Sequence, residues 1–367
     1  MKELIIYKKM NNTLDLYSDY LIVQNKYATS TGLSEMLNGA ISHDKVTRFL
    51  NKEKLTSKEL WKYIKPDVRS NENSEGALIL DDSIEEKPYT DENEIICWHY
   101  SHAKSRQVKG INLLSCLVNY SDISLPIGYE IVHKDIKYSD IETKKVKRKA
   151  AITKNEHFRE ILKQAYNNKV LFSWVLADNW FAAKENLDYI HYTLKKNFIM
   201  GIKSNRNVVL SEKDKEEGNF TKVSKLDLED GQSLKVWLRG IEFPMQLIKK
   251  IFMNEDGSTG VLYLISNDLI HDADYLYLIY QKRWNIEVYH KSIKQNASLA
   301  ASPTKRVLSQ ANHLFCSLIS YCKLELLKIK TATNHFAMKH QLILKANQAS
   351  YFELLKLKSS LAYKASA

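Results

Sequence analysis

The stretch YQKRWNIEVYHKSIK, residues 280–294, carries polar and charged side chains at offsets of 0, 3, 7 and 14: Tyr280, Arg283, Glu287 and Lys294. An α-helix turns by about 100° per residue, so all four would lie in a stripe roughly 60° wide on one helix. Isoleucines repeat every seven residues on a neighbouring face and would pin the helix against a core: Ile279, Ile286 and Ile293. The stripe therefore points either at something held by the rest of the fold or at solvent, with Arg283 and Glu287 as a surface ion pair.

The charge of the chain favours a polyanionic partner. The sequence has 367 residues, 54 of them basic and 43 acidic, and its net charge is +11. Nucleic acid is preferred over a membrane surface, because no apolar run approaches the ~20 residues that a spanning helix needs. The N-terminus MKELIIYKKM lacks the apolar core of a signal peptide. We therefore expect a cytoplasmic protein without a membrane partner or a nucleotide cofactor.

The cysteines give no sign of a metal site. Cys97, Cys116, Cys316 and Cys322 form no CxxC pair and stand in apolar stretches. They are expected to be reduced core residues, which argues against both a zinc site and a disulfide framework.

Residues 30–66 have the layout of a helix-turn-helix. Apolar residues at helical spacing precede NGA (38–40), a turn sequence, and Ser42 can cap a helix over HDKVTRFL. In such a unit Arg48 would face the major groove, together with His43, Lys45 and Thr47. An ordinary helical hairpin fits the same pattern, and both interpretations stay open.

The central part of the chain predicts a mixed α/β sheet. ALILDDS (77–83) and VLFSWVLADNWF (170–181) are apolar runs that end in aspartates, as buried strands do. Further strands are expected at 94–101, 111–120, 125–132 and 198–203, and helices after the capping box of Thr153 and Glu156, at 182–196 and at 305–328. Residues 69–76 are expected to be a linker. Short β-like runs between about 205 and 265 indicate a β-rich insertion.

Three carboxylates stand out: Asp82 or its neighbour Asp81 at the end of one strand, Asp178 at the end of another, and Glu287 in the stripe. Clustered hard oxygen ligands are what Mg²⁺ or Mn²⁺ requires, and two such ions about 4 Å apart support in-line phosphoryl displacement. Arg283 and Lys294 would then bind DNA phosphates, with Tyr280 donating a hydrogen bond. Taken singly, strand-end aspartates are also common turn formers.

The spacing Y-x2-R-x3-E-x6-K resembles the signature of bacterial insertion-sequence transposases of the DDE class, in the Y-R-E-K group. ILDDS resembles that family's first catalytic-aspartate segment, and LADNWF its second. The family also has a β-rich insertion before the glutamate. The resemblance spans roughly residues 30–325.

This resemblance implies an RNase H-like core and cut-and-paste transposition of an insertion sequence. Asp82, Asp178 and Glu287 would be catalytic and bind two Mg²⁺ or Mn²⁺ ions, with Asp82 chosen over Asp81 because the family places its aspartate before Thr or Ser. Water would cut the terminal inverted repeats, and the freed 3′-OH would attack target DNA. Members can also stack a flipped base on tryptophan; Trp237 and Trp284 are candidates by position, although a core role suits each.

The implied organisation is an N-terminal helical DNA-binding region (1–70), a catalytic domain (71–330) with the insertion, and a helical tail (331–367). A homodimer is expected, because two element ends must be cut together, and the protein would be associated with the nucleoid. Two alternatives stay open: an RNase H-like site-specific nuclease without strand transfer, and an inactive DNA-binding repressor of the element. Basic residues such as Lys104, Arg106, Lys109 and the run 144–149, with His102, would contact DNA or lie in solvated loops.

Overall fold

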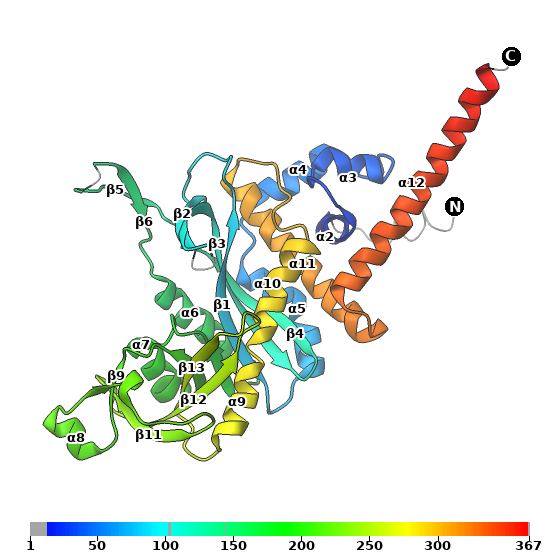
Figure 1. Cartoon of the computed structure of the whole chain (residues 1–367). Coiled ribbons are helices and arrows are strands. Elements are labelled where there is room, and N and C mark those ends of the chain that lie inside the picture. Colours follow the sequence, from blue (N-terminus) through cyan, green and yellow to red (C-terminus); the bar gives the residue numbers. More distant parts are fainter. Residues whose placement is uncertain (1–12, 102–103, 143, 366–367) are drawn as a thin grey trace. The chain divides into compact units, whose positions relative to one another are not determined.

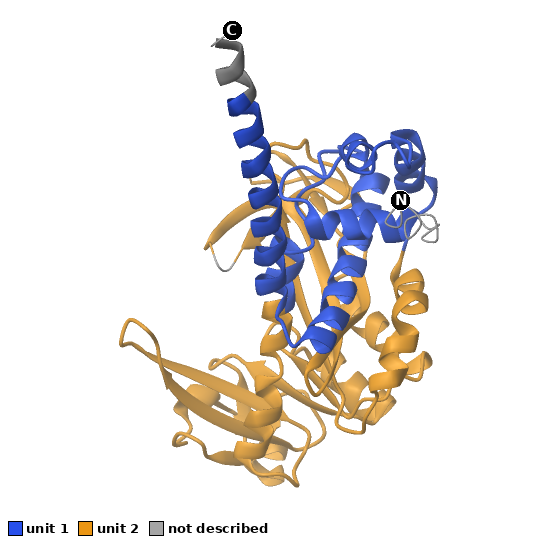
Figure 2. Ribbon diagram, turned by 90° about the vertical axis from the view of Figure 1, so that its right-hand side faces the viewer, with its two compact units in different colours: residues 1–55, 289–367 blue, residues 56–288 orange. Residues whose placement is uncertain are grey.

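The computed structural model describes residues 13–101, 104–142 and 144–365. The chain forms two compact units: residues 1–55 with 289–367 make unit 1, and residues 56–288 make unit 2 (Figure 2). The expectations for the N-terminal decapeptide and for His102 fall outside the described residues. The functional roles expected for residues 1–70, 71–330 and 331–367 stay predictions.

Unit 2 is built on one large mixed sheet (Figure 1). Its central strands lie in the order β4-β3-β1-β7-β8, with β2 also paired to β3. β1 is antiparallel to β3 and parallel to β7, and β7 is parallel to β8. The bounds are β1 Ala77–Glu86, β2 Cys97–Ser101, β3 Arg106–Tyr120, β4 Ile123–Ile131, β7 Trp174–Ala177 and β8 Asn197–Ile202. This arrangement confirms the expected RNase H-like core.

Helices cover the sheet and explain its apolar strands. α6 (Lys154–Asn167) packs against β3 and β4, α5 (Ser57–Asn71) against β4, and α9 (Ala273–Gln281) against β8. Strands that are covered on both faces have continuous apolar sequences. This is the case for β1, whose first four residues are all buried. The Thr153–Glu156 capping box starts α6 as predicted. The sheet therefore holds β1 and β7 in fixed positions relative to one another.

The β-rich insertion continues the same sheet. β13 pairs antiparallel with β8, and the sheet then extends in the order β12, β11, β9, β10. Its strands are β9 Asn207–Val209, β10 Thr221–Lys222, β11 Ser233–Leu238, β12 Met245–Met253 and β13 Thr259–Ser266; it also contains α8 Glu212–Glu217 and a 3₁₀ turn, Val223–Lys225. Trp237 is buried in β11, which agrees with a core role.

Three local expectations need correction. The expected linker begins later, because α5 continues to Asn71. The helix expected at 182–196 is α7 (Lys184–Asp188) followed by a π-helical segment, Tyr189–Leu194. The basic run 144–149 is partly a strand, since β6 (Val146–Lys149) pairs with β5 (Ile136–Ser139) as a separate two-stranded hairpin.

The opening stretch is not one helix. α9 ends at Gln281, and α10 (Trp284–Gln295) begins after a two-residue turn. In that turn the N–H groups of Lys282 and Arg283 donate to carbonyls three residues back rather than four, at 3.1 and 2.8 Å, which tightens the chain. The predicted isoleucine seam is nevertheless buried throughout: Ile279, Ile286 and Ile293.

Unit 1 is helical. It contains α2 (Thr13–Val23), α3 (Ser30–Met36), α4 (His43–Lys52), the second half of α10, α11 (Val307–Thr331) and α12 (His335–Ala365). The Asn312 side chain on α11 donates to the carbonyls of Leu50 and Glu53 at 3.0 and 2.8 Å and accepts from the Leu55 N–H at 2.9 Å. These bonds satisfy backbone groups at the end of α4 and fix α4 on α11. All four cysteines of the chain are free and buried, as expected.

Residues 30–52 form two helices joined by a turn, an arrangement that fits both the expected helix-turn-helix and an ordinary helical hairpin. Ser42 caps α4 by accepting from the Lys45 N–H, and Asn38 and Gly39 in the preceding turn have positive φ. Val46 and Leu50 are buried, whereas Arg48 is exposed. In the described part of the chain, no helix is long and apolar enough to cross a membrane.

The buried carboxylate of Glu325 gives a test of unit 1. It lies 2.9 Å from His335 Nε2 and also pairs with Lys328, and its side chain is 3% exposed. Glu325→Gln should lower the free energy of unfolding by about 3–5 kcal/mol, because it removes the charge of a buried carboxylate that pairs with Lys328 and contacts the buried His335. Urea unfolding followed by circular dichroism measures this change.

Glu353→Gln is the matched control. Glu353 also pairs with a lysine three residues on, but its side chain is 63% exposed, so we expect a change below about 0.5 kcal/mol. Equal effects of the two substitutions would contradict the role given to burial.

Candidate active site

The site forms where the pairing of two parallel strands ends. The strand end expected at Asp81 or Asp82 is wrong, because β1 continues to Glu86 along β3. β1 and β7 are paired in register through Leu80 and Ala177, so the next residues, Asp81 and Asp178, continue from neighbouring positions of the sheet. Neighbouring positions on paired strands direct their side chains to the same face. Asp81 and Asp178 therefore lie side by side, at the point where both apolar runs end.

Glu287, on helix α10, lies close to Asp81 on strand β1. Carboxylate oxygens of Asp81 and Glu287 lie within 4.8 Å of one another. Glu287 is in the first turn of α10, directly after the tight turn at Lys282 and Arg283, so this turn determines where its carboxylate stands. Asp81, Asp178 and Glu287 form the carboxylate cluster.

Arg283 links members of the carboxylate cluster. Its Nη1 lies 3.6 Å from Asp81 Oδ2 and 3.3 Å from Glu287 Oε1, and its side chain is 16% exposed. Burial alone would lower the pKa of Arg283, but Tyr280, Asp81 and Glu287 outweigh it and raise that pKa. The guanidinium is thus a fixed positive charge between two carboxylates, which partly offsets their repulsion.

Burial and repulsion control the protonation of the cluster. Burial raises the pKa of Asp81 to about 8, with the charges of Asp178 and Asp82 as further causes. The pKa of Asp178 is also raised, mainly by burial, although the Trp180 N–H donates to its Oδ1 at 2.9 Å. Carboxylates in such a place are ionised most readily when a further positive charge joins them.

The side chain of Asp82 has different contacts from that of Asp81. Alternation along β1 directs it to the face opposite Asp81, where Asn112 donates to its Oδ2 and Lys154 Nζ lies 2.9 Å from its Oδ1. Lys154 is the first residue of α6, so the capping box of that helix positions it; its Nζ also lies 4.7 Å from the centre of the Trp180 ring. Asp82 therefore holds a lysine, whereas Asp81 faces Glu287.

The remaining predicted residues are placed as follows. Tyr280 is buried at the end of α9, and burial raises its pKa to about 12. Trp284 is 66% exposed, so it is not a core residue. Lys294 lies in the part of α10 that belongs to unit 1, and Arg48 lies on α4 in the same unit.

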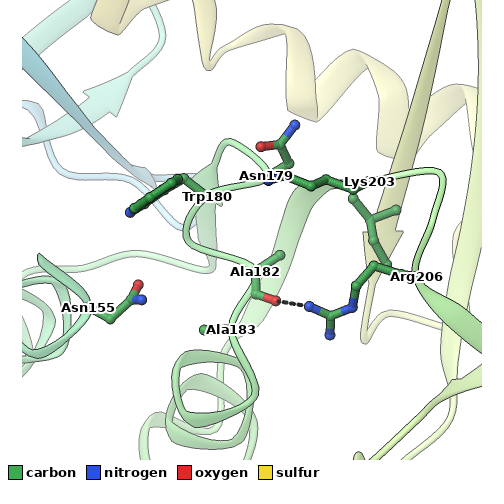
Figure 3. A pocket seen from close by; sticks show the side chains of 8 residues that line it. Asn155, Asn179, Trp180, Ala182, Ala183, Lys203 and Arg206 are labelled. Atoms are coloured by element: carbon green, nitrogen blue, oxygen red, sulfur yellow. Dashed lines mark hydrogen bonds between the residues drawn. The ribbon is translucent and has the colours of Figure 1, made fainter. Parts of the chain in front are cut away.

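A pocket of about 260 Å³ opens directly after Asp178 in the chain (Figure 3). Asn155, Asn179, Trp180, Lys203 and Arg206 contribute its polar, aromatic and basic lining. The Arg206 guanidinium donates to the Ala182 carbonyl at 3.3 Å, which holds it at the pocket wall. A basic pocket with amide groups fits a phosphate-bearing ligand.

Sequence reasoning missed Lys154, Asn112 and the basic pocket residues, because no pattern along the chain shows which loops meet. It also preferred Asp82. A usable signal existed there: Asp81 and Asp178 are each the first acidic residue after an apolar run, so pairing of the two runs in register brings the aspartates level.

The mixed sheet and the carboxylates that follow the paired segments of β1 and β7 define an RNase H-like protein with an acidic site. Two family models match the chain. The model described as a DDE superfamily endonuclease matches residues 6–218, and the model described as a transposase DDE domain matches residues 140–323. Each covers at least half of the chain, which therefore belongs to the DDE superfamily of transposases and endonucleases. A comparison with curated proteins found no match.

Family membership supports a transposase-type function with nuclease-type catalysis, and enzymes of this superfamily use divalent metals. The two matched ranges together include Asp81, Asp178 and Glu287. The donor set fits such an ion, because carboxylate oxygens of Asp81 and Glu287 are near enough to one another to share it.

The raised pKa of Asp81 predicts a pH effect in the presence of a chelator. The unfolded-state pKa of an aspartate is ~3.9, so between about pH 4 and pH 8 the folded protein binds more protons than the unfolded chain, and stability falls as pH rises. Asp81→Asn should weaken this decline, by a few kcal/mol at most. Urea unfolding at a series of pH values in EDTA measures it.

Asp135→Asn, at an exposed position, is the control and should leave the decline unchanged. A wild-type slope in Asp81→Asn would show that Asp81 is not a buried, repelled carboxylate.

Proposed function

We propose that this protein is a DNA transposase of the Y-R-E-K group that moves an insertion sequence by a cut-and-paste route. The observation that carries the proposal is the carboxylate cluster: Asp81 level with Asp178 directly after the paired segments of β1 and β7, and Glu287 within 4.8 Å of Asp81. The family match supports the transposase-type function, and the mechanism goes beyond it.

Asp81, Asp178 and Glu287 would hold two Mg²⁺ or Mn²⁺ ions. Bound there, the ions would activate a nucleophilic water or 3′-OH and stabilise the leaving oxygen. We assign the first ligand to Asp81 in place of Asp82, because Asp82 is engaged with Lys154 and Asn112 on the other face. Arg283 keeps the Asp81 and Glu287 carboxylates in position.

Several basic side chains around the cluster would bind DNA phosphates. Lys154 stands between Asp82 and the Trp180 ring, and Lys203 and Arg206 line the pocket that follows Asp178. Trp284 is exposed on α10 and can contact DNA directly, whereas the buried Tyr280 supports Arg283. Lys294 would add a phosphate contact. Lys203 and Arg206 would orient the scissile phosphate.

The helix-turn-helix of unit 1 would hold the terminal inverted repeats. α4 is capped and exposes Arg48, His43, Lys45 and Thr47 while Val46 and Leu50 are buried, as a recognition helix requires. A homodimer would bring two element ends together, and target DNA would enter after cleavage.

The decisive experiment uses a labelled duplex carrying the element's own terminal repeat, incubated with Mg²⁺ or Mn²⁺. The wild type should nick at the repeat boundary and join the 3′ end to target DNA. Glu287→Gln, which is nearly isosteric, should bind the repeat without cutting it. Cutting without joining would indicate a site-specific nuclease, and binding without cutting by the wild type would indicate a repressor.

The pair Asp81→Asn and Asp82→Asn separates the two neighbouring aspartates in the same assay. Asp81→Asn should reduce cleavage to background, because it removes a metal ligand. Asp82→Asn should lower the rate of cleavage by about 10–100-fold, as expected for a residue that positions other side chains. The reverse order would return the first ligand to Asp82.

Arg48→Ala tests the recognition helix. If Arg48 contacts a base, binding to the terminal repeat should weaken by about 1–3 kcal/mol and discriminate less against a scrambled duplex. Lys358→Ala removes an exposed charge from α12 and should not change this discrimination. Equal weakening of repeat and scrambled duplex would assign Arg48 to the phosphates alone.

A further inference from the structure

Strands β5 and β6 form an arm that stands apart from the large sheet. Among the described strands they pair only with one another, and Figure 1 shows the hairpin extending away from the rest of unit 2. This hairpin, residues 136–142 and 144–149, is named here the β5–β6 arm. All four residues of β5 and three of the four in β6 are exposed. A two-stranded hairpin by itself is marginally stable in water, so a partner that covers the arm would stabilise it.

The arm has a closed turn at its tip and an ion pair at its base. At the tip the Asp140 N–H donates to the Lys145 carbonyl at 3.0 Å, and Lys147 Nζ lies 2.7 Å from Asp140 Oδ2. At the base the Arg148 guanidinium lies 3.3 Å from a carboxylate oxygen of Glu92. The basic run 144–149 is therefore part of a defined element and not a solvated loop.

The arm carries an excess of positive charge. Its sequence contains six basic residues and two acidic ones, Asp140 and Glu142. Three of its lysines are exposed and form no ion pair with any residue that the structure describes: Lys137, Lys144 and Lys145. Positive charge that is not neutralised inside the protein fits the phosphates of a nucleic acid.

Basic side chains lie on both faces of the ribbon. In the β5–β6 register Tyr138 is opposite Lys147, and Lys137 is opposite Arg148. Opposite residues share a face and successive residues alternate, so each face has two basic side chains: Lys147 and Lys149 on one, Lys137 and Arg148 on the other. An element on a membrane surface separates an apolar face from a charged one, whereas a DNA groove has phosphates along both of its walls. Duplex DNA therefore suits this charge distribution better than an anionic membrane does.

An apolar side chain stands at the tip of the arm. Ile141 is 94% exposed, in the turn between the two strands, and the exposed Lys144 and Lys145 follow it closely in the sequence. A single exposed isoleucine is common and carries no argument by itself. At the end of a basic ribbon, however, it matches the apolar wedges that DNA-bending proteins insert between base pairs from the minor groove.

The base of the arm is close in the chain to the carboxylate site. Lys154 follows Lys149 by five residues, and its Nζ lies 2.9 Å from Asp82 Oδ1. Five residues span at most about 18 Å. A duplex bound at the carboxylate cluster can therefore also reach the arm.

We propose that the β5–β6 arm binds duplex DNA in the minor groove, inserts Ile141 between base pairs and bends the duplex, while its exposed lysines contact phosphates. The inference rests on the proposed function for its ligand, which is the duplex that a transposase holds. Bending itself requires neither a metal ion nor cleavage.

The wedge is tested by energy transfer between two dyes at the ends of a duplex, with the full chain in EDTA, where cleavage does not occur. The wild type should bend the duplex by about 20–90°. Ile141→Ala should bind the duplex but lose most of this bend, and Ile141→Leu should keep it. Ile270→Ala, at an isoleucine that is 90% exposed, is the matched control and should bend the duplex as the wild type does.

The lysines are tested by the salt dependence of binding to the same duplex. The triple variant Lys137→Gln, Lys144→Gln, Lys145→Gln should reduce the slope of log affinity against log salt concentration by about 3, because each lost phosphate contact removes ~0.9. The control removes equal charge by the same replacement at three exposed lysines of α12 and should leave the slope unchanged: Lys345, Lys356 and Lys358.

Circular dichroism of each variant checks that the chain still folds. A wild-type bend in Ile141→Ala, or a wild-type slope in the triple variant of the arm, would overturn the inference. Loss of binding to phosphatidylserine vesicles, with duplex binding unchanged, would also overturn it and assign the arm to anionic lipid. Because these measurements need no catalysis, bending that depends on Ile141 in a protein that fails the cleavage assay would support the arm and reject the transposase mechanism.

Discussion

The structure depends on the register in which the parallel strands β1 and β7 pair. Each of these strands has an aspartate directly after its apolar run, and the register places Asp81 beside Asp178. Burial at this position raises the pKa of Asp81, so negative charge is costly there. The repulsion between these two carboxylates has to be offset by positive charge. Arg283 supplies part of it from the turn between α9 and α10, and a divalent cation would supply the rest.

Around this pair each element has a definable task. The tight turn before α10 brings Glu287 toward Asp81, and the capping box of α6 brings Lys154 to Asp82 on the opposite face. Adjacent residues of one strand thus serve different purposes because strand side chains alternate. The insertion extends the sheet beyond β8, and β2 lies at the other end of the sheet.

Much of this was predictable from sequence. The apolar runs, the capping box, the spacing of the opening stretch and the Ser42 cap are local signals, and the corresponding elements are present. The choice between Asp81 and Asp82 depends on register, which two distant strands determine only once they pair. The break at Lys282 and Arg283 leaves the isoleucine spacing almost unchanged, so periodicity did not show it. Lys154, Lys203 and Arg206 meet the site through long-range packing, for which the sequence carries no periodic signal.

Calorimetric titration of Mn²⁺ into the wild type, Asp81→Asn and Asp82→Asn tests the central claim most directly. This titration measures which carboxylate binds the ion and does not depend on DNA cleavage. The account predicts that the wild type binds Mn²⁺, that Asp82→Asn binds it with an affinity reduced by at most about 10–100-fold, and that Asp81→Asn shows no measurable binding. Unchanged binding by Asp81→Asn, with loss in Asp82→Asn, would contradict it.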